Sequence, residues 1–139
     1  MDEKLRCGIP EIDAQHEELH SLVVSVQELI ADKSKRHLLH PALRQLNQQL
    51  VTHFEYEESL LAMVSDEELA RHKRTHKGLL SVFNDFFARP QATTEYDYFG
   101  RVVSEKVIAH VMEHDFQMMD RVKEYLANRR CIADSGSNP

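Results

Sequence analysis

The sequence predicts an all-α protein, an antiparallel four-helix bundle whose consecutive helices run up, down, up and down. With 139 residues the chain has the length of about one ordinary domain. Gly and Pro number only four each, and Val and Ile do not gather in alternating runs, so helices are favoured over strands. Apolar residues recur instead every three or four positions, in four segments with short connections, which is typical of a helical bundle.

The first two helices are predicted from proline positions and apolar stripes. Pro10 opens the first helix, because proline suits a first helical turn, and the stripe fades at residues 32–34. Residues 33–40 then form a polar connection with His37 and His40 in solvent, and Pro41 opens the second helix. The inner faces carry Ile12, His16, Leu19, Val23, Val26 and Ile30 in the first helix, and Leu43, Leu46, Leu50, Phe54, Glu57 and Leu61 in the second.

The third helix is predicted to begin at a capping box. Ser65 and Glu68 have the three-residue spacing at which a serine side chain caps a helix start. The helix ends before Arg89-Pro90, because the residue before a proline avoids the helical conformation. Its inner face consists of Leu69, His72, His76, Leu79, Phe83 and Phe86.

The fourth helix is expected to start at Thr93 or Thr94 and to run without a break to about residue 129. Gly100, in its first turns, makes the exact start less well defined. Residues 131–139 have the Gly, Ser, Asn and Pro composition of a linker, and we expect them to be disordered. Residues 1–130 therefore form the predicted domain.

Charge and composition exclude several classes of function. The net charge is −6 and no basic tract is present, which argues against nucleic acid as a partner. The first residues are charged and no long apolar stretch follows, so neither a signal peptide nor a membrane span is expected. Without a secretion signal, Cys7 and Cys131 are expected to be free thiols of a cytoplasmic protein.

Histidine is over-represented at helical spacing. The chain has nine histidines, and random placement would give on average less than one pair separated by four residues, the spacing that stacks side chains on a helix. Three such pairs occur, at His16/His20, His72/His76 and His110/His114. Each could be an ordinary core histidine, but burying several imidazoles without partners costs about 1–3 kcal/mol each. A bound metal would satisfy several of them together.

Two pairs suggest chelation more directly than the others. His72 and His76 lie one helical turn apart, so both imidazoles can bind one ion, although a bare HxxxH pattern often has no such role. His53 and Glu57 form a similar HxxxE pair on the second helix. A lone glutamate is usually solvated, but Glu57 shares the apolar face of Phe54, and burial beside a cation is the better interpretation.

These motifs, in this order on four helices, resemble the signature of the hemerythrin family over residues 8 to about 128. The matching elements are His16 in GIPEIDAQH, HxxxE at 53–57, HxxxH at 72–76 and HxxxxD at 110–115. The resemblance implies two non-haem irons joined by an oxo or hydroxo bridge. It assigns one iron to His72, His76 and His110, the other to His16 and His53, and both bridging carboxylates to Glu57 and Asp115.

The fourth helix departs from the simplest geometry. Asp115 follows His110 by five residues, which rotates it by about 140° on an ideal helix. His114 is better placed, so the family's use of the aspartate would need a local π-type bulge, a feature that concentrates at functional sites. The chain also lacks Trp, and Lys106 lies one turn before His110. His20 and His114 are expected to be surface residues or outer partners, and Asp13, Glu17 and Glu18 are candidates to orient ligand imidazoles.

Several functions are compatible with this site. The implied ligand set gives the three-histidine iron six ligands and leaves the other with one open position, at which the family binds O2. Such a protein could carry oxygen or sense it, and in the second case a fused or partner signalling domain would receive the signal through the last helix. An open diiron site also permits reduction of peroxide or nitric oxide, so an enzyme is the alternative. A ferritin-like oxidase is disfavoured because it needs two Glu-x-x-His motifs, and this chain has one.

Overall fold

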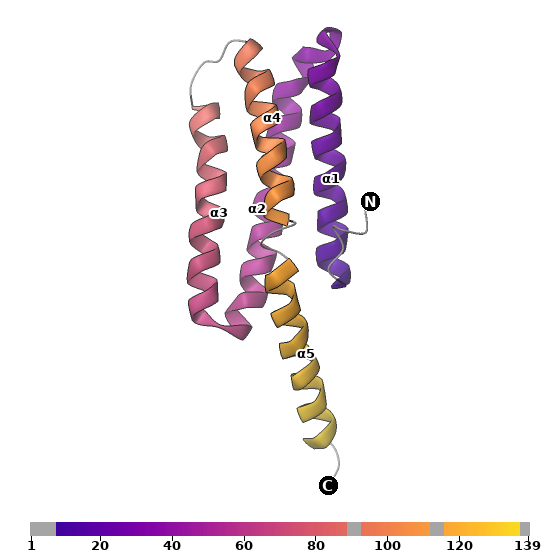
Figure 1. Ribbon diagram of the computed structural model, residues 1–139, viewed down its shortest axis with the longest axis vertical. Helices are drawn as coiled ribbons and strands as arrows, with labels where there is room; N and C mark the ends of the chain where they lie inside the picture. The colour runs from indigo at the N-terminus through magenta and orange to yellow at the C-terminus, as the bar shows by residue number, and fades with distance from the viewer. Residues whose placement is uncertain (1–7, 89–92, 112–115, 137–139) are drawn as a thin grey trace.

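A computed structural model describes residues 8–88, 93–111 and 116–136 of the chain, and for 93–95, 116–117 and 129–136 it describes the backbone alone. In these residues the chain forms five α-helices and one short 3-10 helix (Figure 1). The elements are α1 (Pro10–Ala31), the 3-10 helix η2 (Lys33–Leu38), α2 (Leu39–Val64), α3 (Asp66–Phe87), α4 (Thr93–His110) and α5 (Phe116–Gly136). None of these helices is long and apolar enough to cross a membrane.

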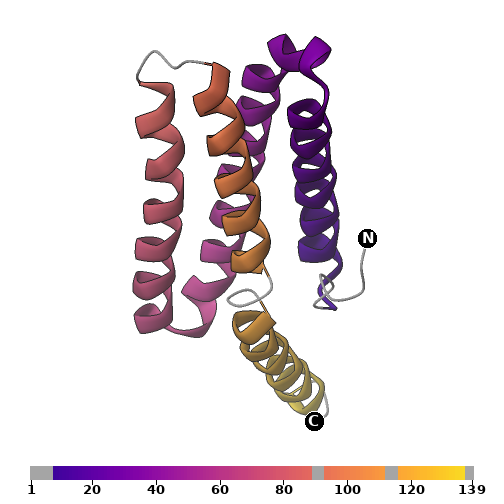
Figure 2. The same cartoon turned by 45° about the horizontal axis from the view of Figure 1, so that its top comes forward.

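The first four α-helices lie side by side as a bundle, and consecutive helices run in opposite directions (Figures 1 and 2). α1 packs against α2 and α4, and α2 packs against α3. α5 continues from the end of α4 and projects beyond the bundle, away from η2 (Figure 1). The predicted all-helical bundle is therefore present.

The start of α1 agrees with the prediction, whereas the start of α2 differs from it. Pro10 is the first residue of α1. α2 begins at Leu39 rather than at Pro41, so Pro41 lies inside the first turn, where a missing N–H removes no helical hydrogen bond. The expected polar connection forms η2, which Asp32 caps by accepting hydrogen bonds from the Ser34 backbone N–H at 3.0 Å and the Ser34 hydroxyl at 2.6 Å. These bonds lower the pKa of the Asp32 carboxyl.

The apolar side chains form two separate clusters. The main apolar cluster fills the bundle on the side of η2, and the second apolar cluster lies where α5 begins. The buried residues of the main cluster are Leu19, Leu22, Val23, Val26, Ile30, Leu39, Leu43, Leu46, Leu50, Phe54, Phe83, Phe86, Phe99, Val103 and Val107. Those of the second cluster are Ile9, Ile12, Leu61, Met118, Met119 and Val122. The helices must therefore cross a layer between the clusters that neither of them fills.

Gly100 allows α4 to approach α1 closely. A Cβ atom at this position would lie 2.8 Å from Ile30 Cδ1 and 3.2 Å from Val26 Cγ1. Because real Cβ atoms do not show contacts below 3.0 Å, a side chain at residue 100 would displace Ile30. Gly100, which made the predicted start of this helix less well defined, thus has a packing role.

The C-terminal region differs from expectation in two respects. The structure describes two helices, α4 and α5, on either side of residues 112–115, where we expected one. Val111, directly before these residues, has π-helical backbone, and helices commonly change course at such positions. α5 also continues to Gly136, although we expected disorder from residue 131. Residues 127–133 include Ala and Arg, which favour helix, and glycine is a common helix end.

The role of Ser65 as the N-cap of α3 can be tested by mutation. The structure confirms Ser65 as the N-cap, because its hydroxyl accepts a hydrogen bond from the Glu68 N–H at 3.3 Å. Ser65→Ala should lower the free energy of unfolding by about 1 kcal/mol, because it leaves a helix-start N–H without this partner. Urea unfolding of the purified protein measures the change. Ser65→Asp is the control and should retain most of the stability; an equal loss would contradict the capping role.

Candidate metal centre

The candidate ligands occupy the layer between the two apolar clusters. On α1, His16 lies between Ile12 of the second cluster and Leu19 of the main cluster. On α2, His53 and Glu57 lie between Leu50 and Leu61 in the same way. His76 of α3 and His110 of α4 complete the layer, and all five side chains are buried. Buried polar side chains from four helices thus lie together in one layer of an otherwise apolar bundle.

These five residues form two groups that share Glu57. One group consists of His16, His53 and Glu57, and the other of Glu57, His76 and His110. Within each group the potential ligand atoms all lie within 4.8 Å of one another. The first group joins α1 to α2, and the second joins α2, α3 and α4. The carboxylate of Glu57 therefore belongs to both potential ligand sets.

The first group is oriented by a residue that sequence reasoning missed. The Nδ1 atom of His53 donates a hydrogen bond to the side-chain oxygen of Gln15 at 2.8 Å. This bond places the proton on Nδ1 and leaves the Nε2 lone pair for a ligand role. Nε2 contacts Glu57 Oε1, and the rings of His16 and His53 meet edge to face with centroids 4.9 Å apart. Gln15 therefore fixes which nitrogen His53 presents.

The second group packs around the ring of Phe54. The His76 imidazole stacks on Phe54 with centroids 3.9 Å apart, and the His110 ring meets the same phenyl edge to face at 5.1 Å. His76 Nε2 lies 3.8 Å from Glu57 Oε2, and His76 Nδ1 lies 3.9 Å from Glu58 Oε2. Burial raises the pKa of the Glu58 carboxyl, which the nearby Lys73 partly offsets. Phe54 thus holds two imidazoles in fixed orientations.

His72 lies at the edge of the layer and belongs to neither group. Its ring is half-buried, and its centroid is 6.1 Å from that of His76. The Nδ1 atom of His72 donates a hydrogen bond to the Glu68 carbonyl oxygen at 2.9 Å. As with His53, this bond leaves Nε2 as the nitrogen that can act as a ligand. His72 therefore lies beside the polar layer but is in neither of the two potential ligand groups.

Other predicted residues have different positions. Asp115 and His114 lie outside the described residues. His20 is half-buried and is in neither ligand group among the described residues. Of the three candidates to orient imidazoles, Glu17 and Glu18 are exposed. Asp13 accepts a hydrogen bond from the backbone N–H of Gly8 at 3.1 Å.

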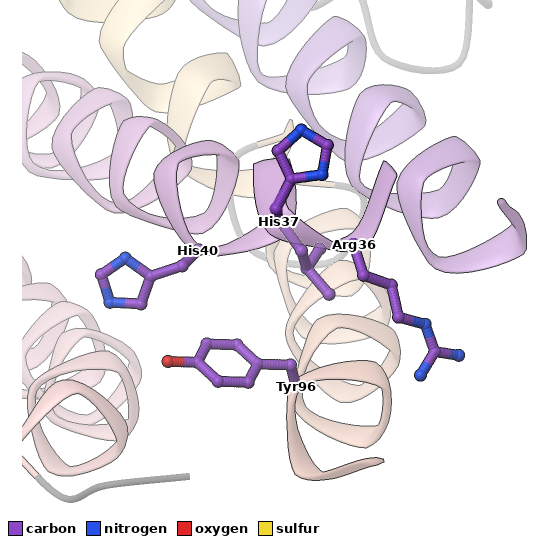
Figure 3. A pocket seen from close by; sticks show the side chains of 5 residues that line it. Arg36, His37, His40 and Tyr96 are labelled. Atoms are coloured by element: carbon purple, nitrogen blue, oxygen red, sulfur yellow. The ribbon is translucent and has the colours of Figure 1, made fainter. Parts of the chain in front are cut away.

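A separate hollow lies at the η2 end of the bundle. It has a volume of about 260 Å³ and is lined by Arg36, His37, Leu39, His40 and Tyr96. Figure 3 shows Tyr96 of α4 reaching toward His40, with the guanidinium of Arg36 directed away from both. His40 is half-buried and meets the rings of Phe87 and Tyr96 edge to face, so its expected solvation is wrong. His37 is exposed as expected.

The comparison with protein families agrees with this site. The model of the hemerythrin HHE cation-binding domain matches residues 7–128, nearly the whole chain. The chain therefore belongs to the hemerythrin family, a class of helical metal-binding domains. No curated protein and no solved structure gives a significant match.

The donor set fits the non-haem iron that membership of this family implies. Four imidazoles and one carboxylate, without a thiolate, suit iron or manganese. A fully buried carboxylate such as Glu57 is expensive unless positive charge compensates it, and a cation in the shared position supplies that charge. The residues present are thus suited to hold metal.

The hydrogen bond from His53 to Gln15 generates a second prediction. Gln15→Ala removes the acceptor that orients the imidazole, and loss of such an outer partner typically weakens metal affinity about 10- to 100-fold. Competition with a chelator for the bound iron measures the affinity. Gln15→Glu retains an acceptor oxygen and should lose less. Exposed Glu18→Ala is the matched control on the same helix, and an equal effect there would show that Gln15 has no orienting role.

Proposed function

We propose that this chain is a diiron protein in which Glu57 bridges the two metal ions. The observation that carries the proposal is the sharing of Glu57 by two otherwise separate ligand groups. One ion takes His16 and His53, and the other takes His76 and His110. A single-ion site would not explain why two groups of histidines share one carboxylate, with His53 next to Oε1 and His76 3.8 Å from Oε2.

The family pattern completes this ligand set. We assign His72 to the ion held by His76 and His110, because its Nδ1 already has an acceptor and its ring lies next to His76. We assign Asp115 as the second bridge, with an oxo or hydroxo group between the ions. α4 and the first turns of α5, which bury Met118, Met119 and Val122 in the second apolar cluster, would then form the fourth side of an antiparallel four-helix bundle.

The unequal division of imidazoles supports binding of dioxygen. With three histidines on one ion and two on the other, the ion held by His16 and His53 keeps one position for an external ligand. A ferrous pair held by these residues would supply the two electrons that reversible binding of O2 requires. Leu19 and Leu50, each one turn from these histidines and fully buried, exclude water from that side of the layer. Reversible binding in the cytoplasm would make the protein an oxygen carrier or an oxygen sensor.

The metal stoichiometry tests the site. Protein expressed with abundant iron should contain two irons per chain, and His76→Ala should lower both the iron content and the thermal stability. The stability falls because bound metal stabilises the folded state, by about 2.7 kcal/mol when free metal exceeds its dissociation constant 100-fold. Asp115→Ala should alter the visible spectrum, whereas His114→Ala should not. One iron per folded chain, or the reverse order of these two variants, would contradict the assignment.

The reaction with oxygen tests the function. Mixing the ferrous protein with oxygenated buffer in a stopped-flow instrument should produce a charge-transfer absorption band that disappears when oxygen is removed. A band that forms and then decays without release of O2 would favour a sensor over a carrier. If no such band forms while peroxide or nitric oxide is consumed rapidly, the protein is an enzyme and the oxygen-binding function is wrong.

A further inference from the structure

A groove between α3 and α4 leads to the metal layer. It has a volume of about 280 Å³, and its lining residues are Thr75, Gly78, Leu79, Val82, Lys106, Ala109 and His110. His110 belongs to the ligand group that contains Glu57 and His76. Because one water occupies about 30 Å³ in the liquid, the groove has room for several waters or a small solute. A small molecule in it would lie against a candidate metal ligand.

Gly78 keeps this groove wide. A glycine inside a helix destabilises it by about 0.5–1 kcal/mol relative to alanine, so its presence is usually explained by a close contact. Here a Cβ atom would meet no atom within 4 Å. The glycine is therefore not needed for packing, and its missing side chain leaves the α3 wall of the groove open, while α4 contributes the small side chain of Ala109.

Lys106 gives the groove its charge. Its side chain lines the groove one helical turn before His110, and the residue is exposed. Among the described residues that line the groove, Lys106 is the only one with a full charge, and none is acidic. The chain as a whole has a net charge of −6, which repels anions at long range. The groove is thus a place where an anion meets a cation beside the metal layer.

We propose that the α3–α4 groove admits small inorganic anions to the metal layer and that Lys106 selects them by charge. The proposal rests on the proposed metal site, and it adds a route to that site and a charged residue that selects what enters. Leu79 and Val82 give the groove apolar walls, so a small linear or bent anion is favoured over a large hydrated one. A neutral molecule such as O2 could use the same route without help from Lys106.

The charge of Lys106 is tested with azide as the anionic probe. At low ionic strength, Lys106→Gln should slow azide association with the ferric protein about three- to tenfold, the effect expected when one charge a few ångströms away is removed. Near 1 M salt, where screening acts over about 3 Å, the difference should largely disappear. Association of O2 with the ferrous protein should not change.

The matched control is Lys77→Gln, which removes the same charge from an exposed lysine of α3 that does not line the groove. Its effect on azide association should be clearly smaller than that of Lys106→Gln. Equal effects of the two variants, or an equal slowing of O2 by Lys106→Gln, would overturn selection by Lys106.

The route itself is tested by filling the groove. Gly78→Leu places a side chain in space that is open in the structure, so the fold should remain intact. This variant should slow both azide and O2, whereas Gly78→Ala, which adds one carbon, should slow them less. Unchanged rates for both probes in Gly78→Leu would show that ligands use another route.

A metal-free experiment separates this proposal from the diiron assignment. In the isotope-labelled metal-free protein, titration with azide should shift the NMR signals of the Gly78, Lys106 and Ala109 amides saturably, and Lys106→Gln should abolish the shifts. This result would support the groove even if the iron content contradicted the diiron site. The absence of saturable shifts in the wild-type protein would overturn anion binding in the groove.

Discussion

The rest of the structure depends on one buried polar layer between two apolar clusters. Glu57 and four histidines from α1, α2, α3 and α4 are removed from water there. Buried carboxylates and imidazoles are costly without compensation, whereas the side chains of the two apolar clusters need no ligand to be buried favourably. The two ends of the bundle are therefore well packed, whereas the stability of the polar layer between them depends on how its buried polar groups are compensated. A cation at Glu57 satisfies residues on all four helices at once, so metal and fold are coupled there.

The second apolar cluster connects this layer to α5. Met118, Met119 and Val122 of α5 are fully buried, and burial of such side chains stabilises by about 1.5–3 kcal/mol each. An ion pair from Arg121 to the buried Glu68 of α3 adds a polar contact. The carbonyl of Glu68 also accepts the hydrogen bond from His72. Glu68 thus contacts both α5, through Arg121, and the candidate ligand His72.

Local signals made much of the fold predictable, whereas contacts distant in sequence were not. Pro10 and Ser65 begin helices because each favours a helix start through its own backbone or side chain. The spacing of apolar residues also placed Glu57 on a buried face before the structure showed it. Gln15 was missed because several polar residues flank His16, and only the position of α2 determines which of them reaches His53.

The same limit explains the other differences. His40 is half-buried because the ring of Tyr96 arrives from α4, and nothing near His40 in the sequence indicates this contact. The fourth predicted helix was expected to be continuous because its apolar stripe continues on both sides of residues 112–115. The spacing of apolar residues indicates which side chains face a core, but it does not indicate whether they belong to one apolar cluster or to two. Only the three-dimensional arrangement shows that there are two clusters and that α4 and α5 contribute to different ones.

The outer partners make the two halves of the layer electrostatically different. His53 donates to the neutral amide of Gln15, whereas His76 faces the carboxyl group of Glu58. At 3.9 Å an ionised carboxyl group acts on the imidazole through its negative charge, which a neutral amide lacks. In the proposed diiron site, the position beside His76 would therefore favour the more highly charged ion. Next to His53 the outer partner is the neutral Gln15, which would suit the ion that we propose binds an external ligand.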